Sequence, residues 1–361
     1  TVLPSYWHGD WNDSLQPADS SLRERLCSAW TVTLHHQTLS QLGRALARVG
    51  EPDPSLQRDA DAVADAFRRD LLADGVVTGY ALYAEGQPPQ LWLHPRDRLT
   101  GLRYSLLPMM HAVLAELLTP EEAQAQLALI EERLLGPDGA RLFDAPLPYQ
   151  GGRTQRFQRA ETSSFFGREI GVMYMHAHLR WAQTLAHLGR AQALQQALQQ
   201  AHAIDLQQRL PQASLRQSNC YYSSSDAAFP DRYAAHHDYA RLLAGEVALD
   251  GGWRVYSSGP GIFLALLVQQ LLGVRLEHEA LLLDPVMPAA WRGLHVELTL
   301  ADCVLNLHFE PGPLGCGVQQ VLDAAGCPLH FERRPNRYRL GAAALPRPPA
   351  GSRLQLHLHT A

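Results

Sequence analysis

The spacing of apolar residues divides the chain into two parts. From Ser21 to about Leu272 apolar side chains recur every three to four residues, which is the period of amphipathic helices. After Gly273 they alternate with polar side chains, as in β-strands, over stretches such as 296–300, 304–309 and 354–359. The pattern therefore predicts a helical part over residues 1–272 and a β part over residues 273–361.

Several helix boundaries are legible within the first part. Asp53-Pro54 reads as an N-cap with Pro at the first helical position. Thr119 and Glu122 have the spacing of a capping box. Including these two, the pattern predicts about eight helices, with the others near 22–49, 102–117, 168–188, 191–203, 231–243 and 262–272. One hairpin, between 76–83 and 90–94, is expected to interrupt them.

The order of these elements restricts the fold class. No strand–helix–strand alternation is present, which argues against a doubly wound α/β fold. Long helices in antiparallel pairs are typical of stacked helical hairpins, and the second part predicts about six antiparallel strands in a β-sandwich. We therefore expect a mainly α chain that ends in an antiparallel β domain.

Composition and charge exclude some classes of function. With 46% hydrophobic and 19% charged residues, the 361-residue chain can bury a large core. A net charge of −5 argues against a partner such as nucleic acid or an anionic membrane. No apolar run reaches the ~18 residues of a membrane span. Five scattered cysteines without a C-x-x-C pair predict a reducing compartment, the cytoplasm.

A polar motif that contains an indole lies near the start of the chain. Gly9-Asp10-Trp11-Asn12-Asp13 places two carboxylates around Trp11. An indole can cover the apolar face of a pyranose while carboxylates bind hydroxyl groups or donate a proton, so the motif is typical of a sugar site. The alternative is a loop whose Asp caps the next helix.

Two further segments carry candidate chemistry. Ser257-Ser258-Gly259-Pro260-Gly261 reads as a helix N-terminus, whose N–H groups and positive dipole end suit phosphate. The apolar run that follows predicts a buried helix. Glu169 and His176 lie about two turns apart on one side of a predicted helix, where a buried Glu needs a partner or a ligand. An ordinary cap and structural hydrogen bonds are the alternatives.

A polar loop, two pairs of histidines and the lack of nucleotide-binding and hydrolase motifs give weaker information on function. The segment 216–232 is a long polar loop with aromatic, Asn and Ser side chains, which predicts a binding loop. His35-His36 and His236-His237 lack the H-E-x-x-H spacing of a metal site. The sequence contains no P-loop, G-x-S-x-G or dinucleotide-binding motif.

Taken in order, these segments resemble the inverting phosphorylases of glycoside hydrolase family 94. Gly9–Asp13 looks like their catalytic-acid motif, and Glu169–His176 looks like their E-x-G-G-[IV]-x-x-H segment. Ser257-Ser258 stands where they carry Thr-Gly, and Asp284–Trp291 resembles their D-P-x-[IL]-P-x-x-W stretch. The motifs look closest to the branch that acts on 1,2-β-oligoglucans.

The resemblance implies a partial (α/α)6 barrel followed by a C-terminal β-sandwich. It also implies reversible phosphorolysis of β-linked gluco-oligosaccharides with inversion, giving α-glucose 1-phosphate. Asp13 would be the acid that protonates the leaving oxygen. The other implied site residues are Trp11 and Glu169 for the sugar, and His176, Ser257 and Ser258 for phosphate. No metal or organic cofactor is implied, because phosphate is already the nucleophile. These six residues are expected to converge on one cavity.

Two other functions remain open from the sequence. An inverting glycoside hydrolase on the same barrel would need a second carboxylate as base, for which Glu161 and Asp226 are candidates. The third possibility is a non-catalytic carbohydrate-binding fragment. Family members carry a β-sandwich and further barrel helices before the acid motif, so the resemblance covers their C-terminal portion. The implied partners are β-gluco-oligosaccharide, phosphate, and a missing N-terminal half or a second copy covering an apolar flank near 22–49.

Overall fold

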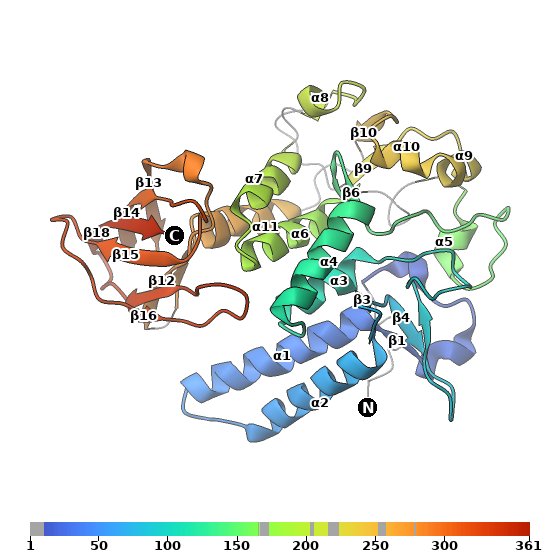
Figure 1. Ribbon diagram of the computed structural model, residues 1–361, viewed down its shortest axis with the longest axis horizontal. Helices are drawn as coiled ribbons and strands as arrows, with labels where there is room; N and C mark the ends of the chain where they lie inside the picture. The colour runs from blue at the N-terminus through green and yellow to red at the C-terminus, as the bar shows by residue number, and fades with distance from the viewer. Residues whose placement is uncertain are drawn as a thin grey trace. The chain divides into compact units, whose positions relative to one another are not determined.

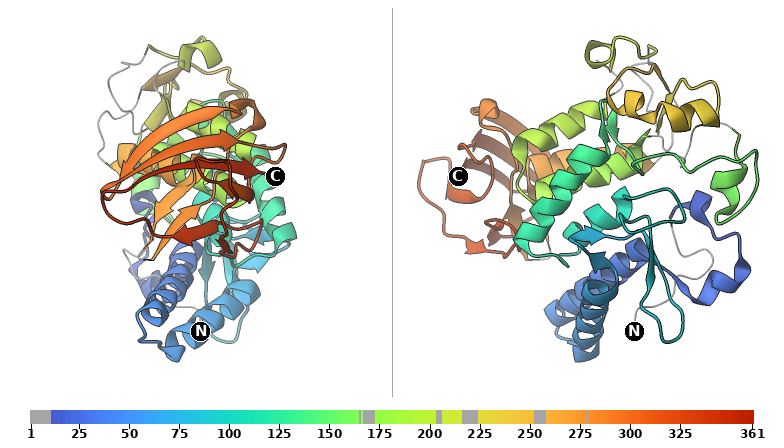
Figure 2. Two further views of the ribbon diagram at one scale, coloured as in Figure 1. Left: turned by 90° about the vertical axis from the view of Figure 1, so that its left-hand side faces the viewer. Right: turned by 45° about the vertical axis from the view of Figure 1, so that its right-hand side comes forward.

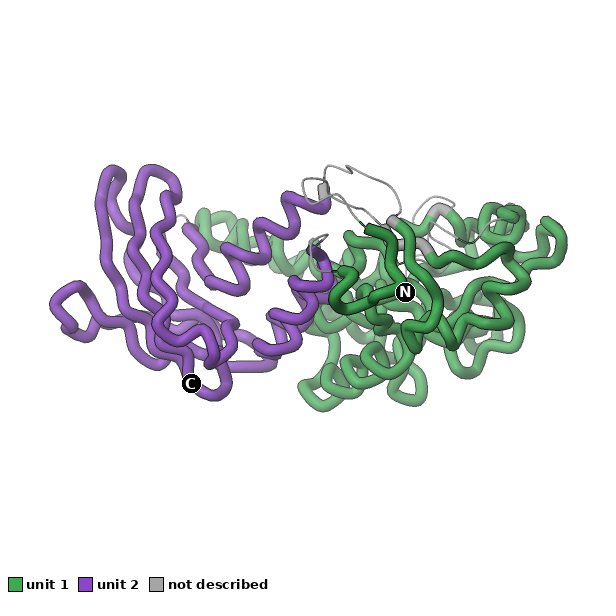
Figure 3. Tube along the Cα trace, turned by 90° about the horizontal axis from the view of Figure 1, so that it is seen from above, with its two compact units in different colours: residues 1–178, 203–256 green, residues 179–202, 257–361 purple. Residues whose placement is uncertain are grey.

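The computed structural model describes residues 11–164, 166, 173–202, 206–215, 224–251, 258–277 and 279–361. The chain forms two compact units, the first of residues 1–178 and 203–256, the second of residues 179–202 and 257–361 (Figure 3). These units differ from the division at residue 272 that the change of period predicts. Two helical segments, 179–202 and 257–272, group with the C-terminal strands because compactness follows contacts rather than secondary-structure type.

The first unit holds most of the helices. Helices α1 and α2 lie side by side and antiparallel (Figures 1 and 2). The bounds are α1 (Ala29–Arg48), α2 (Pro54–Asp70), α3 (Leu106–Leu114), α4 (Pro120–Arg133), α5 (Gln158–Thr162), α8 (Leu206–Arg209), α9 (Arg232–His237), α10 (Tyr239–Leu243), and the 3-10 turns η1 (Asp13–Leu15) and η2 (Ser20–Glu24). The two predicted caps are confirmed, because Asp53 accepts from the Ser55 N–H and Thr119 forms a capping box with Glu122.

Four small sheets accompany these helices. Their orders are β1 (Leu26–Ser28), β4 (Tyr80–Leu82), β5 (Gln90–Trp92); β10 (Leu249–Gly251), β9 (Ser224–Ala227), β8 (Met173–Tyr174); β2 (Leu72–Ala73), β3 (Val76–Val77); and β6 (Leu135–Gly136), β7 (Gly139–Ala140). The predicted hairpin is confirmed at β4 and β5. The expectation of a single hairpin is wrong, because strands of two or three residues are too short to show alternation in the sequence.

The second unit combines three helices with two four-stranded sheets. The sheet orders are β11 (Val274–Leu276), β12 (Ala280–Leu283), β17 (Ala343–Pro346), β16 (Glu332–Arg333); and β13 (Leu294–Leu300), β14 (Cys303–Glu310), β18 (Arg353–Thr360), β15 (Val318–Leu322). The helices are the end of α6 (Met175–His187), α7 (Ala191–Gln200) and α11 (Ser258–Leu266), which continues into the π-helical turn η3 (Leu267–Leu271); η4 (Ala289–Trp291) is a 3-10 turn. The eight strands exceed the expected six.

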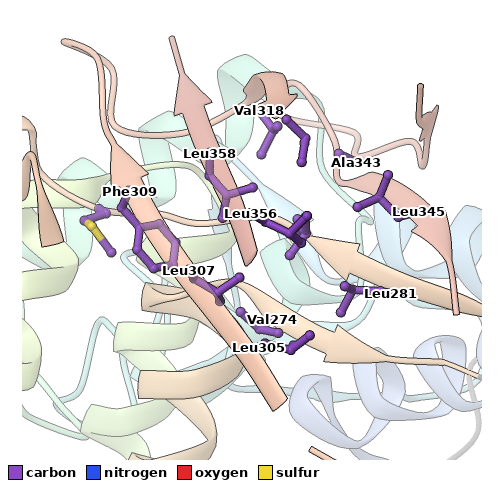
Figure 4. Close-up of a cluster of buried hydrophobic side chains, with 13 residues drawn as sticks. Val274, Leu281, Leu305, Leu307, Phe309, Val318, Ala343, Leu345, Leu356 and Leu358 are labelled. Atoms are coloured by element: carbon purple, nitrogen blue, oxygen red, sulfur yellow. The ribbon is translucent and has the colours of Figure 1, made fainter. Parts of the chain in front are cut away.

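One hydrophobic cluster joins the inner faces of the two sheets. Leu281 and Leu345 come from one sheet, and Leu307 and Leu358 from the other (Figure 4). Along β14 buried and partly exposed positions alternate without a break, as the predicted period of two requires. The alternation therefore identifies the strands and the faces they bury.

The direction of one strand contradicts the sequence-based prediction. We expected only antiparallel pairs, but β14 and β18 run parallel, with Leu305 opposite Leu354 and Phe309 opposite Leu358. Alternation reports which face of a strand is buried and carries no information on strand direction. The parallel pair arises because the chain leaves β14, forms β15, β16 and β17, and returns to the middle of the sheet as β18.

A close backbone crossing marks the start of the β part. Gly273 has φ +68°, and a Cβ there would lie 2.1 Å from the carbonyl carbon of Asp284, so the position requires glycine. The Asp284 carboxylate accepts two hydrogen bonds from the buried Arg339 guanidinium, at 2.5 and 3.0 Å. The D-P stretch that begins at Asp284 is thus tied to the segment that contains Arg339.

Two helices expose apolar side chains. On α1, Leu34 and Leu42 are exposed and fall on one side of the helix, and Val49, just beyond its end, is 71% exposed. Exposed apolar side chains thus occur in the stretch 22–49, and a continuous apolar flank there stays a prediction. On α11, Leu264 is 60% exposed, so the expectation of a fully buried helix is wrong; the described residues cover only part of its surface. None of the described helices is both long and apolar enough to cross a membrane.

A row of three stacked imidazoles crosses the outer face of one sheet. His295, His308 and His357 lie directly opposite one another on β13, β14 and β18, with ring centroids 4.3 and 4.5 Å apart. Partial burial and then the two neighbouring imidazoles lower the pKa of His308 from its ordinary 6.5, while Glu310 acts to raise it. The folded protein therefore resists protonation of His308 more than the unfolded chain does.

The second unit should lose stability as the pH falls below about 6.5. In that range the unfolded chain binds a proton at His308 that the folded chain binds only at lower pH, so unfolding becomes easier until the folded pKa is passed. Thermal unfolding midpoints measured between pH 8 and pH 5 should fall less for His308→Gln than for the wild type. The control is His330→Gln, because His330 is exposed and has no ring contact among the described residues. Parallel curves for wild type and His308→Gln would contradict the expectation.

Candidate functional site

The backbone of the N-terminal motif is held against the segment before α5. Asn12 is buried and accepts a hydrogen bond from the Ser14 N–H at 3.1 Å, which starts the turn η1. The Ala18 N–H donates to the Arg156 carbonyl at 2.7 Å, and the Gln158 N–H donates to the Gln16 carbonyl at 2.9 Å. Asp13 is the first residue of η1 and Asn12 is the N-cap, so the alternative in which an Asp of the motif caps the next helix is wrong. These hydrogen bonds, made by residues just before and just after Asp13, fix its backbone.

A series of aromatic rings connects this motif to the start of α6. The indole of Trp11 meets the ring of Tyr174 edge to face, with centroids 5.1 Å apart. The Tyr174 ring stacks on the imidazole of His176 at 5.7 Å. Tyr174 is buried, whereas Trp11 and His176 are partly exposed. Two of the predicted site residues, far apart in sequence, therefore lie on either side of one tyrosine.

Part of the expected binding loop is a strand beside this tyrosine. Residues Ser224–Ala227 form β9, which pairs with β8 so that Ser224 lies opposite Tyr174 and Ser225 opposite Met173. The prediction of a loop over 216–232 is wrong for this stretch; residues 216–223 lie outside the described residues. Four residues are too few for a pattern of period two, and three serines in a row hide it. The polar segment nevertheless lies next to the Tyr174 backbone.

A buried arginine and a buried carboxylate hold the backbone around α5. The Arg232 guanidinium donates to the carbonyl groups of Leu147, Ala160 and Ser163, at 2.6 to 3.0 Å. The Glu161 carboxylate accepts from the N–H groups of Gln155 and Arg156. These contacts fix α5 and its flanks, and they give Glu161 a structural role.

The second imidazole of the α6 motif is structural. His178 is buried, and its Nδ1 accepts a hydrogen bond from the Ala140 N–H at 3.1 Å. His178 is two residues from His176, so on a helix the two side chains point in different directions. The contact with β7 explains its position, since it ties the first turn of α6 to the β6–β7 hairpin.

The remaining predicted residues are placed only in part. Glu169 and Ser257 lie outside the described residues, as do the side chains of Asp13, Ser258 and Asp226. Helix α11 begins at Ser258, as the sequence predicts. Convergence of all six residues on one cavity therefore stays a prediction. Within the described part of the chain, no group of three or more His, Cys, Asp or Glu residues is arranged to hold a metal ion.

Sequence reasoning missed two side chains near the motif. No sequence pattern singles out Tyr174, although its ring contacts both Trp11 and His176. Asp144 accepts from the N–H groups of Arg103 and Tyr104, each at 3.0 Å, and burial raises its pKa. The neighbouring Phe143 lines, with Asn12, a hollow of about 10 Å³, room for about one water molecule. A single Tyr or Asp forms no motif with a defined spacing, so the sequence could not have identified Tyr174 or Asp144.

A known carbohydrate enzyme is similar to this chain in sequence. Over 348 residues it is 39% identical to a 1,2-β-oligoglucan phosphorylase of Listeria innocua serovar 6a; this match covers 96% of the chain and 31% of the relative. The chain thus spans about a third of the relative's length. No protein-family model matches.

Solved structures give a weaker likeness. A wild-type glycosidase matches with 16% identity over 71% of this chain and 55% of its own, at a TM-score of 0.40. A glycosidase variant in complex with glucose matches with 16% identity over 67% and 52%, at a TM-score of 0.39. Scores of this size do not establish a common fold. The sequence match is the informative one, and it confirms the resemblance read from the motifs: along nearly all of its length, this chain is similar to part of a 1,2-β-oligoglucan phosphorylase.

Proposed function

We propose that this chain carries the acid and the phosphate-binding residues of an inverting phosphorylase that acts on 1,2-β-linked gluco-oligosaccharides. The observation that carries the proposal is the 39% identity over 96% of the chain to a 1,2-β-oligoglucan phosphorylase. The helical part would belong to an (α/α)6 barrel and residues 273–361 to a β-sandwich. The two sheets that share one core support the second assignment.

In the proposed reaction Asp13 donates its proton to the glycosidic oxygen as the bond to the anomeric carbon breaks. A phosphate oxygen attacks that carbon from the opposite face, which gives α-glucose 1-phosphate and a glucan shorter by one unit. Phosphate is already an anion, so the reaction needs no second carboxylate as base, no metal and no organic cofactor. Trp11 and Glu169 would hold the sugar that is transferred.

Phosphate would be bound by His176, Ser257 and the N–H of Ser258. The start of α11 at Ser258 supports this role, because N–H groups and the helix dipole attract anions there. The stack of Tyr174 on His176 supports it as well, since the ring contact holds the imidazole in one orientation.

We also propose a cytoplasmic location. The absence of disulfides among the four described cysteines fits it.

The hydrolase alternative receives less support from the described residues. Its candidate base, Glu161, is buried, and its carboxylate is occupied by two backbone N–H donors. A general base must instead accept a proton from water, so its lone pairs have to face the substrate. The side chain of Asp226, the other candidate, lies outside the described residues.

The test is phosphate dependence. The protein is incubated with 1,2-β-gluco-oligosaccharides with and without phosphate, and glucose 1-phosphate and glucose are quantified. Glucose 1-phosphate formed only with phosphate supports the proposal. Glucose released at the same rate without phosphate would establish a hydrolase. Calorimetric titration with oligosaccharide and with phosphate gives a readout in a chain without turnover, and binding of neither would contradict the proposal.

Replacing His176 should act mainly through phosphate. His176→Ala is expected to raise the apparent KM for phosphate about 10- to 100-fold, because a hydrogen bond to a charged group is lost, with a smaller effect on the KM for glucan. His176→Phe keeps a ring on Tyr174 but lacks the nitrogen atoms, so it should show the same loss. If His176→Phe kept the wild-type KM for phosphate, the imidazole would serve packing alone.

A further inference from the structure

A hollow of about 350 Å³ lies on the outer face of the sheet β11-β12-β17-β16, within the second unit. None of the residues that line it belongs to the candidate active site. Its size falls in the range of small-ligand sites, about 300–1,000 Å³. The hollow therefore needs an explanation of its own.

Small side chains on two neighbouring strands form its floor. Ala280 on β12 lies opposite Pro346 on β17, and Ala344 on β17 lies opposite Glu332 on β16. Ala280 and Ala344 belong to a small buried cluster, whereas their sequence neighbours Leu281 and Leu345 point into the main core. Because successive side chains of a strand alternate between faces, the alanines face outward. A floor of methyl groups leaves room above the sheet.

The rim carries polar side chains for which no partner is found among the described residues. Glu279, Glu332 and Arg334 are exposed, and among the described residues none of their side chains makes a hydrogen bond or an ion pair. The exposed imidazole of His330 and the ring of Phe331 complete the lining. Two carboxylates and one guanidinium, without partners among the described residues, therefore surround an apolar floor.

This chemistry selects a neutral molecule rich in hydroxyl groups. Carboxylates accept and guanidinium groups donate pairs of hydrogen bonds, which suits adjacent hydroxyl groups, while the apolar floor suits the C–H face of a pyranose ring. Two carboxylates against one guanidinium repel anions, so phosphate and sugar phosphates are disfavoured. The mixture of polar rim and apolar floor is typical of small-ligand sites.

We propose that the hollow is a second carbohydrate site, which binds a stretch of gluco-oligosaccharide away from the reacting bond. The choice of glucan as the ligand rests on the proposed function. A second site on the same chain raises the local concentration of a long substrate, so it should favour long glucans over short ones.

The experiment uses the whole chain and a 1,2-β-gluco-oligosaccharide. Hydrogen exchange, followed by mass spectrometry, should slow in residues 330–334 and 343–346 when the sugar is added. The double variant Glu332→Gln with Arg334→Gln should bind the sugar at this place about tenfold more weakly or worse, since charge-assisted hydrogen bonds are lost. Glu297→Gln, an exposed residue of the other sheet, is the control. Trp11→Ala should weaken binding at the candidate active site and leave protection of 330–334 intact.

The outcomes separate this proposal from the proposed function. Phosphate-dependent turnover without protection of 330–334 would overturn the second site alone. Protection of 330–334 without turnover would support the second site and would contradict only the phosphorylase proposal. Wild-type binding by the double variant, or protection by glucose 1-phosphate in place of the oligosaccharide, would also overturn the second site. Unchanged circular dichroism of the double variant excludes unfolding as the cause of lost binding.

Discussion

Asp13→Asn is expected to lower the rate of phosphorolysis of unactivated glucans about 10²- to 10⁴-fold, the contribution of a positioned general acid. Asparagine has nearly the same size as aspartic acid but cannot donate the proton that the leaving sugar needs. The loss should appear in kcat, and the KM for phosphate should change little. The measurement is the rate of glucose 1-phosphate formation in a form of the protein that is active on 1,2-β-oligoglucans.

A substrate whose leaving group departs as a stable anion distinguishes acid catalysis from simple damage. On such a substrate Asp13→Asn should keep much of the wild-type rate, because no proton is required. Asp19→Asn is the matched control, since Asp19 is an exposed cap only six residues away. If Asp13→Asn lost activity on both substrates equally, or retained near-normal rates on natural glucans, Asp13 would not be the acid.

Asp138→Asn is expected to destabilise the first unit by about 3–5 kcal/mol, the effect of removing one partner of a buried ion pair. The Arg141 guanidinium donates to both carboxylate oxygens of Asp138, at 2.8 and 2.9 Å, and the two side chains are 0% and 1% exposed. The variant leaves a buried cation without its counter-charge. Unfolding by urea, followed by circular dichroism, measures the change.

A double variant tests this explanation. Asp138→Leu with Arg141→Met removes both charges, and it should recover much of the stability that either single change loses, because apolar side chains avoid the desolvation of charge. Arg96→Met, which breaks an exposed pair with Asp74, is the control and should cost at most about 1 kcal/mol. A loss below 1 kcal/mol for Asp138→Asn would show that the pair contributes little.

This ion pair also has a consequence for the candidate site. Asp138 lies in the turn between β6 and β7, and the Ala140 N–H of β7 holds His178 in the first turn of α6. His176 is in the same turn. Loosening the hairpin should therefore raise the KM for phosphate as well as lower stability, whereas Arg96→Met should change neither.

Local features of the fold were determined by the sequence itself. The caps at Asp53 and Thr119 depend on hydrogen bonds within three residues, so the residue types alone predict them. The alternation in β14 and the helix start at Ser258 likewise depend only on residues that are neighbours in the sequence. The recognition motifs are short contiguous segments for the same reason, and they were sufficient to predict the relationship that the 39% identity confirms.

Only the tertiary structure decided which distant segments meet. The period of Leu354–His359 is the same for either strand direction, and the parallel pairing with β14 depends on the path of the intervening strands. The contact of Tyr174 with both Trp11 and His176 joins segments more than 160 residues apart, and no local pattern encodes it. Long-range pairings are selected by the burial of whole faces. For that reason the sequence of this protein predicts its elements and motifs, whereas packing decides how they are brought together.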